Sequence, residues 1–149
     1  MDDTDIRILR ILQEDSSLSI TEVARRVSLS ASPCWKRINK LEAEGIICRQ
    51  TAVLDAEKMG FGLTVFVEVR TGEHSGLWLR KFADLVANMP EVLEFHRLAG
   101  EVDYLLKVKV RDMKRFDEFY KRLIETMPLA EVTSRFSMEK INETTALPI

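Results

Sequence analysis

The first third of the chain places apolar residues at helical spacing in three consecutive segments. In each segment apolar side chains recur every three or four positions, which is typical of a helix with one buried face. These segments are residues 3–15, 20–27 and 30–45. Ser19 and Glu22 have the spacing of a capping box before the second segment, and Gly45 suits the end of the third. The pattern therefore predicts three packed helices.

After Gly60 the apolar positions alternate with the period of β-strands, and helical stretches interrupt them. The β-branched residues 46–54 before this change predict an extended wing or linker strand. The later segments predict strands at 62–70, 91–98, 104–110 and 131–141, with helices at 76–89 and 113–127. Their order is βαββαβ, a ferredoxin-like split βαβ unit. We expect two domains, residues 1–60 and 61–149.

Two helices can cover only one face of a four-stranded sheet, so the other face needs a partner. We expect that face to carry four apolar residues: Phe66, Leu98, Leu105 and Phe136. A second copy of the same sheet is the simplest cover, which predicts a homodimer.

The charge of the chain is distributed unevenly. The net charge is −2 over 149 residues, but residues 19–40 hold five cations against the single carboxylate of Glu22. A local cationic patch on an acidic protein favours a polyanion bound in one place. Cys34 and Cys48 are expected to be small buried hydrophobes, and we expect no metal and no cofactor. No apolar run reaches the length of a membrane span and the acidic N-terminus is unlike a signal peptide, so a cytoplasmic location is expected.

The third helix carries the candidate chemistry. Cys34, Ile38 and Leu41 lie at i, i+4 and i+7 and predict its buried side. The opposite side collects hydroxyl, indole, ammonium and amide groups, which can contact phosphates and base edges of double-stranded DNA. The predicted DNA-binding residues are Arg25, Arg26, Ser30, Ser32, Pro33, Trp35, Lys36, Arg37, Asn39 and Lys40. The alternative is a solvated helix face with the indole packed on a neighbouring domain.

The stretch SITEVARRVSLSASPCWKRINKLEAEGII resembles the winged helix-turn-helix of Lrp/AsnC, or feast/famine, transcriptional regulators. FHRLAGEVDYLLKVKV resembles their ligand-binding domain, and the similarity covers essentially the whole chain. The resemblance implies an α+β fold with an N-terminal winged helix-turn-helix domain followed by a ferredoxin-like βαββαβ domain for ligand binding and oligomerisation. The PCWKR motif and terminal LPI are most similar to a branch that includes cysteine-responsive regulators.

The resemblance also implies dimers formed through the sheets, assembly of four dimers into octamers, and an amino-acid effector at the seam between dimers. The implied effector contacts follow the second strand of the sheet domain: Ala99, Gly100, Glu101, Asp103 and Tyr104. We expect a neighbouring subunit to complete the side-chain pocket with Ser134, Phe136 and Met138. From the residues alone, the favoured interpretation of the same stretch is an ordinary hairpin turn that Asp103 caps, and Gly100 suits a backbone with a positive φ or a close approach.

The sequence therefore predicts a DNA-binding transcriptional regulator that recognises an imperfect palindrome and responds to a small amino acid. An alternative is a small monooxygenase-like enzyme on the same α+β fold with an accessory helical domain. That enzyme would require a polar constellation or a haem-ligating histidine inside the sheet cavity, and it would leave the basic third helix without a role. A pure assembly domain is a third possibility.

Overall fold

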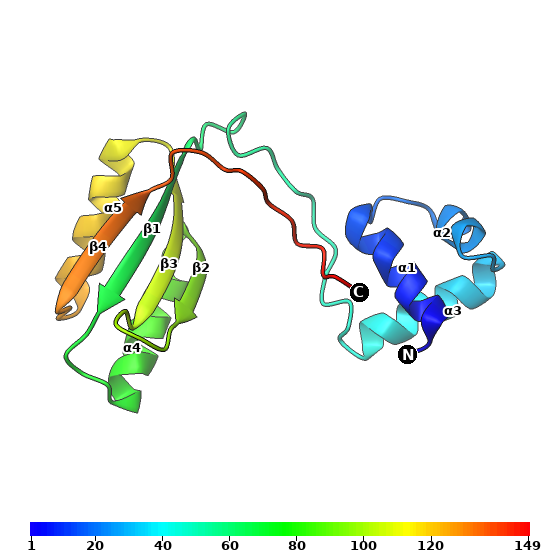
Figure 1. The fold of residues 1–149 in the computed structure, drawn as a ribbon, viewed down its shortest axis with the longest axis horizontal. Helices are drawn as coiled ribbons and strands as arrows, with labels where there is room; N and C mark the ends of the chain where they lie inside the picture. The colour runs from blue at the N-terminus through cyan, green and yellow to red at the C-terminus, as the bar shows by residue number, and fades with distance from the viewer. The chain divides into compact units, whose positions relative to one another are not determined.

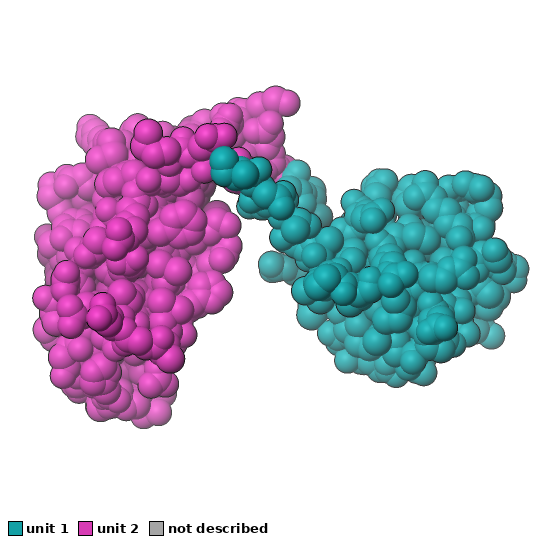
Figure 2. All heavy atoms as spheres, in the orientation of Figure 1, with its two compact units in different colours: residues 1–53, 141–149 teal, residues 54–140 magenta. Residues whose placement is uncertain are grey.

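The computed structural model describes residues 1–149 apart from the side chain of Thr126. Figure 1 shows the elements, and Figure 2 shows the two compact units into which the chain divides: residues 1–53 with 141–149, and residues 54–140. The sequence placed the boundary at residue 60 and residues 141–149 in the second domain. The structure instead groups residues 141–149 with the helices, where Arg10 and Gln13 hold their backbone by hydrogen bonds.

The first unit contains the three expected helices. They are α1 (Asp3–Glu14), α2 (Ile20–Arg26) and α3 (Ala31–Ala43). Their apolar sides meet in one core, as the spacing of three and four predicts. The buried members of this core are Ile8, Val23, Ala24, Val27, Cys34 and Ile38.

The complete capping box of this unit lies at α1, whereas the sequence analysis expected one at α2. A complete box starts α1, where the Asp2 carboxylate accepts hydrogen bonds from the Thr4 and Asp5 N–H groups and the Asp5 carboxylate accepts from the Asp2 N–H. At α2 only half of the expected box forms: the Ser19 hydroxyl accepts from the Glu22 N–H at 3.3 Å. The Glu22 carboxylate is bound instead by the two arginines of its own helix.

The helix α3 ends as predicted, but the predicted wing is absent. Gly45 has a φ of 71°, and the N–H of Ile46 donates to the Leu41 carbonyl at 2.9 Å, which closes the helix with a Schellman motif. Residues 46–54 form no strand, because none of the described strands pairs with them. The segment is therefore an irregular linker.

The second unit has the predicted βαββαβ order and forms one antiparallel sheet with strand order β2-β3-β1-β4. Its elements are β1 (Leu63–Arg70), α4 (Gly76–Ala87), β2 (Val92–Arg97), β3 (Tyr104–Val110), α5 (Met113–Thr126) and β4 (Glu131–Phe136). The ladder between β2 and β3 shifts register between Val92 and Glu94, so the outer strand β2 carries a β-bulge.

Both helices of this unit cover the same face of the sheet (Figure 1). Alternate residues of β1 and β3 point to that face and are buried against aromatic side chains of α4 and α5. The best-buried members of this core are Val65, Val67, Val69, Phe82, Leu106, Val108, Phe119 and Leu123. The hydrophobic effect therefore holds this unit together from one side only.

The opposite face of the sheet is mainly charged. Arg135 pairs with Glu68 at 2.8 Å, and Lys107 pairs with Glu94 at 2.7 Å. Phe66 lies opposite Lys107 in the β1–β3 register and supplies an exposed ring among these charges. Leu105 shares this face, and Leu98 is exposed just after β2.

Phe136 does not belong to that face, contrary to the sequence prediction. It lies opposite Val65, whose side chain faces the helices, and partners in an antiparallel ladder share a face. Its ring centroid lies 5.2 Å from that of Phe116 in α5. The prediction failed because the phase of β4 depends on its register with β1.

Candidate functional site

The two sides of α3 are divided as its sequence pattern predicts. Cys34, Ile38 and Leu41 are buried, whereas residue Trp35 is 53% exposed. Trp35 belongs to neither core of the described residues, so the expected solvent-facing side exists. The predicted residues that share this exposure are Ser30, Ser32, Pro33, Lys36 and Lys40, with Asn39 half-buried. A rigid helix therefore presents hydroxyl, indole and ammonium groups together.

The turn between α2 and α3 contains a feature that sequence reasoning missed. Ser28 has a φ of 60°, in the left-handed region that non-glycine residues seldom occupy. Its N–H donates to the Arg25 carbonyl, and the N–H of Leu29 donates to the Ala24 carbonyl at 2.8 Å. These are the two bonds of a Schellman motif, and they turn the chain sharply from α2 into α3. Only a glycine or asparagine would have signalled this conformation in the sequence.

Arg25 and Arg26 are exposed, but Glu22 occupies both of them. Its carboxylate lies 2.8 Å from Arg25 Nη2 and 2.7 Å from Arg26 Nε. Hydrogen bonds from Arg25 and then Arg26 lower the pKa of Glu22 to about 2, so the carboxylate remains ionised. Exposed pairs of this kind are weak, so a phosphate can displace the carboxylate. The cationic patch is thus partly neutralised until an anion arrives.

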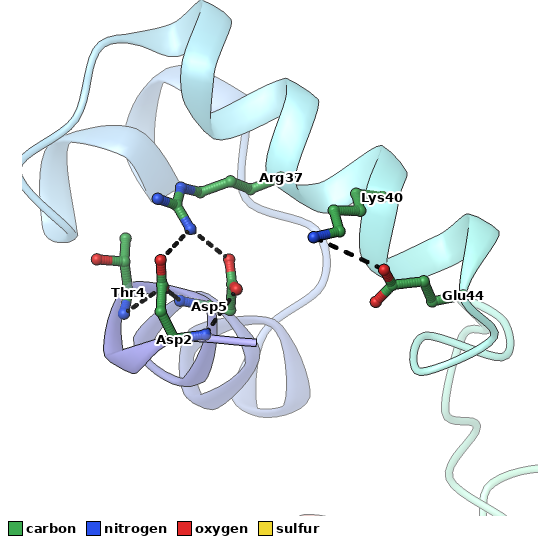
Figure 3. Close-up of polar contacts among 6 residues, drawn as sticks. All are labelled: Asp2, Thr4, Asp5, Arg37, Lys40 and Glu44. Carbon is green, nitrogen blue, oxygen red and sulfur yellow. Dashed lines mark hydrogen bonds and ion pairs between the residues drawn. The ribbon is translucent and has the colours of Figure 1, made fainter.

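Arg37, one of the predicted DNA-binding residues, pairs with two carboxylates at the start of α1. Its Nη1 lies 2.7 Å from Asp5 Oδ1 and 2.8 Å from Asp2 Oδ2, and its side chain points from α3 towards the start of α1 (Figure 3). The guanidinium therefore joins α3 to α1 rather than facing solvent beside Lys36. Sequence reasoning missed this pairing because its partners are more than thirty positions away.

Asp5 is the buried member of that cluster. Burial disfavours its charge, but the Asp2 N–H and the Arg37 guanidinium outweigh burial and lower the pKa of Asp5 below its ordinary value. The ionised carboxylate is thus the form that folding stabilises. This ion pair fixes the rotation of α3 in addition to its apolar contacts.

The effector turn expected after β2 has the predicted backbone at its centre. Gly100 has a φ of 137°, which confirms the expected positive φ, and Ala99 and Glu101 beside it are exposed. Asp103 is half-buried, and its Oδ2 accepts from the Thr71 N–H at 2.8 Å. Its Oδ1 lies 3.8 Å from His74 Nδ1. Asp103 therefore ties the turn to the end of β1 and keeps one oxygen towards the adjoining loop.

Two of the other predicted effector residues face the helix-covered side of the sheet. Tyr104 is buried among the rings of Trp78, Phe82 and Phe95 on the helix-covered face. Ser134 lies opposite Val67 on the same face, where its hydroxyl is buried without a hydrogen-bond partner.

Phe136 packs on α5, while Met138 follows β4 and is 98% exposed. Of the three residues expected to complete a neighbouring pocket, only Met138 is therefore free of the subunit's own core.

The cysteines and the acidic residues indicate no further chemistry. Cys34 is buried as expected, and burial raises the pKa of its thiol. Cys48 is exposed, contrary to expectation, because the segment after α3 leaves the helical core. Among the described residues, no group of three or more His, Cys, Asp or Glu side chains could hold a metal ion, and no helix is long and apolar enough to cross a membrane.

Known protein families match both parts of the chain. Residues 1–47 match a winged helix-turn-helix DNA-binding model, and residues 64–147 match the Lrp/AsnC ligand binding domain. The chain therefore belongs to the Lrp/AsnC family of DNA-binding transcriptional regulators.

Several proteins similar to this chain are regulators. The chain is 51% identical to the DNA-binding transcriptional activator DecR of Escherichia coli K12 over 100% of this chain and 99% of that protein. It is 45% identical to the glutamate uptake regulatory protein of Zymomonas mobilis, over 100% of this chain and 91% of that protein. This chain superposes on the crystal structure of the Neisseria meningitidis regulator NMB0573 with L-Met at a TM-score of 0.94 and 38% identity. The superposition covers 99% of this chain and 96% of that one. The chain is a regulator and not an enzyme, and these names do not single out a cysteine-responsive branch.

The ion pair between α3 and α1 generates a stability prediction. Asp5→Asn should lower the free energy of unfolding of the helical unit at pH 7 by about 1–2 kcal/mol, because it removes a buried charge-assisted acceptor. Because the folded pKa of Asp5 is lowered, its contribution is present above the ordinary pKa of 3.8 and disappears as the pH falls through the folded value. Urea unfolding followed by circular dichroism at pH 7 and pH 3 measures both effects.

Asp3→Asn is the matched control, because Asp3 is an exposed carboxylate in the same helical turn. An equal loss of stability in both variants at pH 7 would show that the helix dipole, and not the pair with Arg37, is responsible.

Proposed function

We propose that α3 reads the major groove of double-stranded DNA through the side that carries Trp35, Lys36 and Lys40. The single observation that carries this proposal is the separation of α3 into a buried apolar side and an exposed side with an indole and two ammonium groups. The tight turn at Ser28 sets α3 against α2 as in helix-turn-helix proteins, whose second helix enters the groove.

The exposed groups divide into those that bind the backbone of DNA and those that distinguish bases. Lys36 and Lys40 attract phosphates, and Lys40 must first leave Glu44, which lies 3.7 Å away on the same helix. Arg25 and Arg26 can bind phosphates once they release the carboxylate of Glu22. Trp35 offers an apolar surface to a thymine methyl or a sugar, and Ser32 and Asn39 offer hydrogen bonds.

The proposed roles predict different outcomes for neighbouring substitutions. Lys36→Ala or Lys40→Ala should weaken binding of all duplexes and reduce the slope of log affinity against log salt by about one, because one phosphate contact is lost. Trp35→Ala should reduce the preference between selected and random duplexes with little change in slope. Fluorescence anisotropy at four salt concentrations measures both quantities.

Lys58→Ala is the control, since Lys58 is an exposed lysine outside α3. If Trp35→Ala left the sequence preference intact, or if Lys58→Ala changed the slope as much as Lys36→Ala, the assignment of this helix face would be wrong.

We also propose that two chains associate through the uncovered sheet face, with octamers of four dimers as the larger assembly. Phe66 and Leu105 provide apolar area, and the surrounding charges are already paired within the chain, so burial leaves few of them without partners. A two-fold axis would place two α3 helices one duplex turn apart, about 34–36 Å, and the operator would be an imperfect palindrome.

Sedimentation velocity tests this assembly. The protein at micromolar concentration should sediment as a dimer or a multiple of one, and Phe66→Lys should shift it towards monomer because a charge would then lie unpaired at the centre of the interface. Met113→Lys, an exposed apolar position at the start of α5, should leave the distribution unchanged. A monomeric wild type would rule out the dimer.

The turn at residues 98–103 is the proposed contact for a small amino-acid effector in the cytoplasm. Exposed N–H groups near Gly100 and Glu101 suit its carboxylate, and Asp103 Oδ1 suits its ammonium group. A sulfur-containing amino acid such as cysteine is proposed from the PCWKR resemblance, and the L-Met in a similar regulator supports that chemical class. A ligand that prefers one assembly over another shifts DNA binding by that difference in affinity.

Calorimetry against the twenty amino acids tests the effector. Wild type should bind at least one of them, and Asp103→Asn should weaken that binding roughly tenfold, because it removes the charge while an amide oxygen can still accept from Thr71. Gly100→Asp should also weaken it, since the added side chain carries a negative charge and is strained at a φ of 137°. Asp84→Asn, at an exposed position of α4, is the control. Equal binding by wild type and both turn variants would place the site elsewhere.

A further inference from the structure

The outer side of α1 holds the backbone of the last residues of the chain. Gln13 Nε2 donates to the Leu147 carbonyl at 2.9 Å, and its Oε1 accepts from the Leu147 N–H at 2.9 Å. Arg10, one helical turn earlier, donates from Nε to the Ile149 carbonyl at 2.5 Å. A side-chain amide that satisfies both the donor and the acceptor of one residue mimics a strand neighbour, so the contact fixes the direction of the tail.

The sequence of the tail suits this contact. Pro148 restricts Leu147 before it to extended conformations, which exposes the N–H and carbonyl of Leu147 for Gln13. The N–H of Ala146 is satisfied within the tail by the Thr144 hydroxyl at 3.0 Å. The tail thus binds through its backbone. The proline lowers the conformational entropy that the tail loses on docking.

The docked tail gives the helical unit a second connection to the sheet unit, which hydrogen bonds complete at α1. The chain leaves the helical unit towards β1 and returns to it after β4. β1 and β4 are neighbours in the sheet: Val65 lies opposite Phe136, and the Ser137 N–H donates to the Thr64 carbonyl at 2.9 Å. Both attachments therefore start side by side at one end of the sheet.

We propose that Gln13 and Arg10 form a dock for residues 147–149, and that this dock is a positioning element for DNA recognition. A helical unit attached at two points samples fewer orientations than one attached at a single point. Two such units on one dimer lose less freedom when both engage a palindrome, so the effective concentration of the second unit at its half-site is higher. This inference rests on the proposed DNA-binding function.

A positioning role makes a prediction that a purely structural role does not. Gln13→Ala, and a chain that ends at residue 146, should bind a full palindromic duplex roughly three- to tenfold more weakly than wild type. Both should bind a duplex with a single half-site within about twofold of wild type, because one unit alone needs no positioning. The probes are the palindrome that wild type selects from a random library and that palindrome cut at its centre, at one salt concentration.

Hydrogen exchange of the Leu147 amide measures docking without DNA. The amide should be protected in wild type and should exchange faster in Gln13→Ala. Asn88→Ala is the matched control, because Asn88 also bonds a backbone carbonyl through its amide, but on α4. It should change neither the exchange at Leu147 nor the binding of either duplex.

The outcomes separate the possible failures. A freely exchanging Leu147 amide in wild type would overturn the dock. The positioning role would be overturned if the tail were released and binding of the full palindrome stayed unchanged. It would also be overturned if affinity fell equally for both duplexes, because the tail would then merely stabilise the helical unit. Failure of wild type to bind either duplex would overturn the proposed DNA reading, and the positioning role with it.

Discussion

The burial of one side of α3 is the interaction on which recognition depends. Cys34 and Ile38 lie in the core that the three helices share, and Leu41 is buried as well. Burying a side chain of leucine size stabilises the fold by roughly 1.5–3 kcal/mol. Because a helix is rigid, fixing its buried side also fixes which groups face outwards. The guanidinium of Arg37, held by Asp2 and Asp5, adds a directional contact that apolar packing lacks. The surface proposed to read DNA is therefore preorganised before any DNA is present.

The sheet unit differs from the helical unit because its core lies on one face of the sheet only. The face beneath α4 and α5 buries aromatic and β-branched side chains, while the other face satisfies its charges in pairs such as Arg135 with Glu68. A surface of satisfied charges with a few apolar side chains remains soluble alone and still tolerates burial. That combination suits a protein whose association responds to a ligand, since the free energy of association stays modest.

The sequence was most informative where local pattern decides the structure. Helix and strand positions, the buried side of α3 and the positive φ of Gly100 follow from periodicity and residue type. Long-range pairing was hidden: Arg37 is held by residues at the chain start, and the face of Ser134 and Phe136 depends on the register of β4 with β1. The segment 46–54 has strand-forming residues but no neighbouring strand, and nothing local reveals that Gln13 binds the backbone of Leu147.

The bulge in β2 has a consequence for how the molecule avoids unwanted growth. The outer strands of an open sheet expose backbone groups that can recruit further strands and nucleate fibrils. Here the outer strand β2 is short and its ladder with β3 is interrupted between Val92 and Glu94, while β4 places Glu131 and Arg135 along the other rim. Both rims are thus poor templates for strand addition. A high local concentration of this sheet therefore carries little risk of growth into amyloid-like polymers.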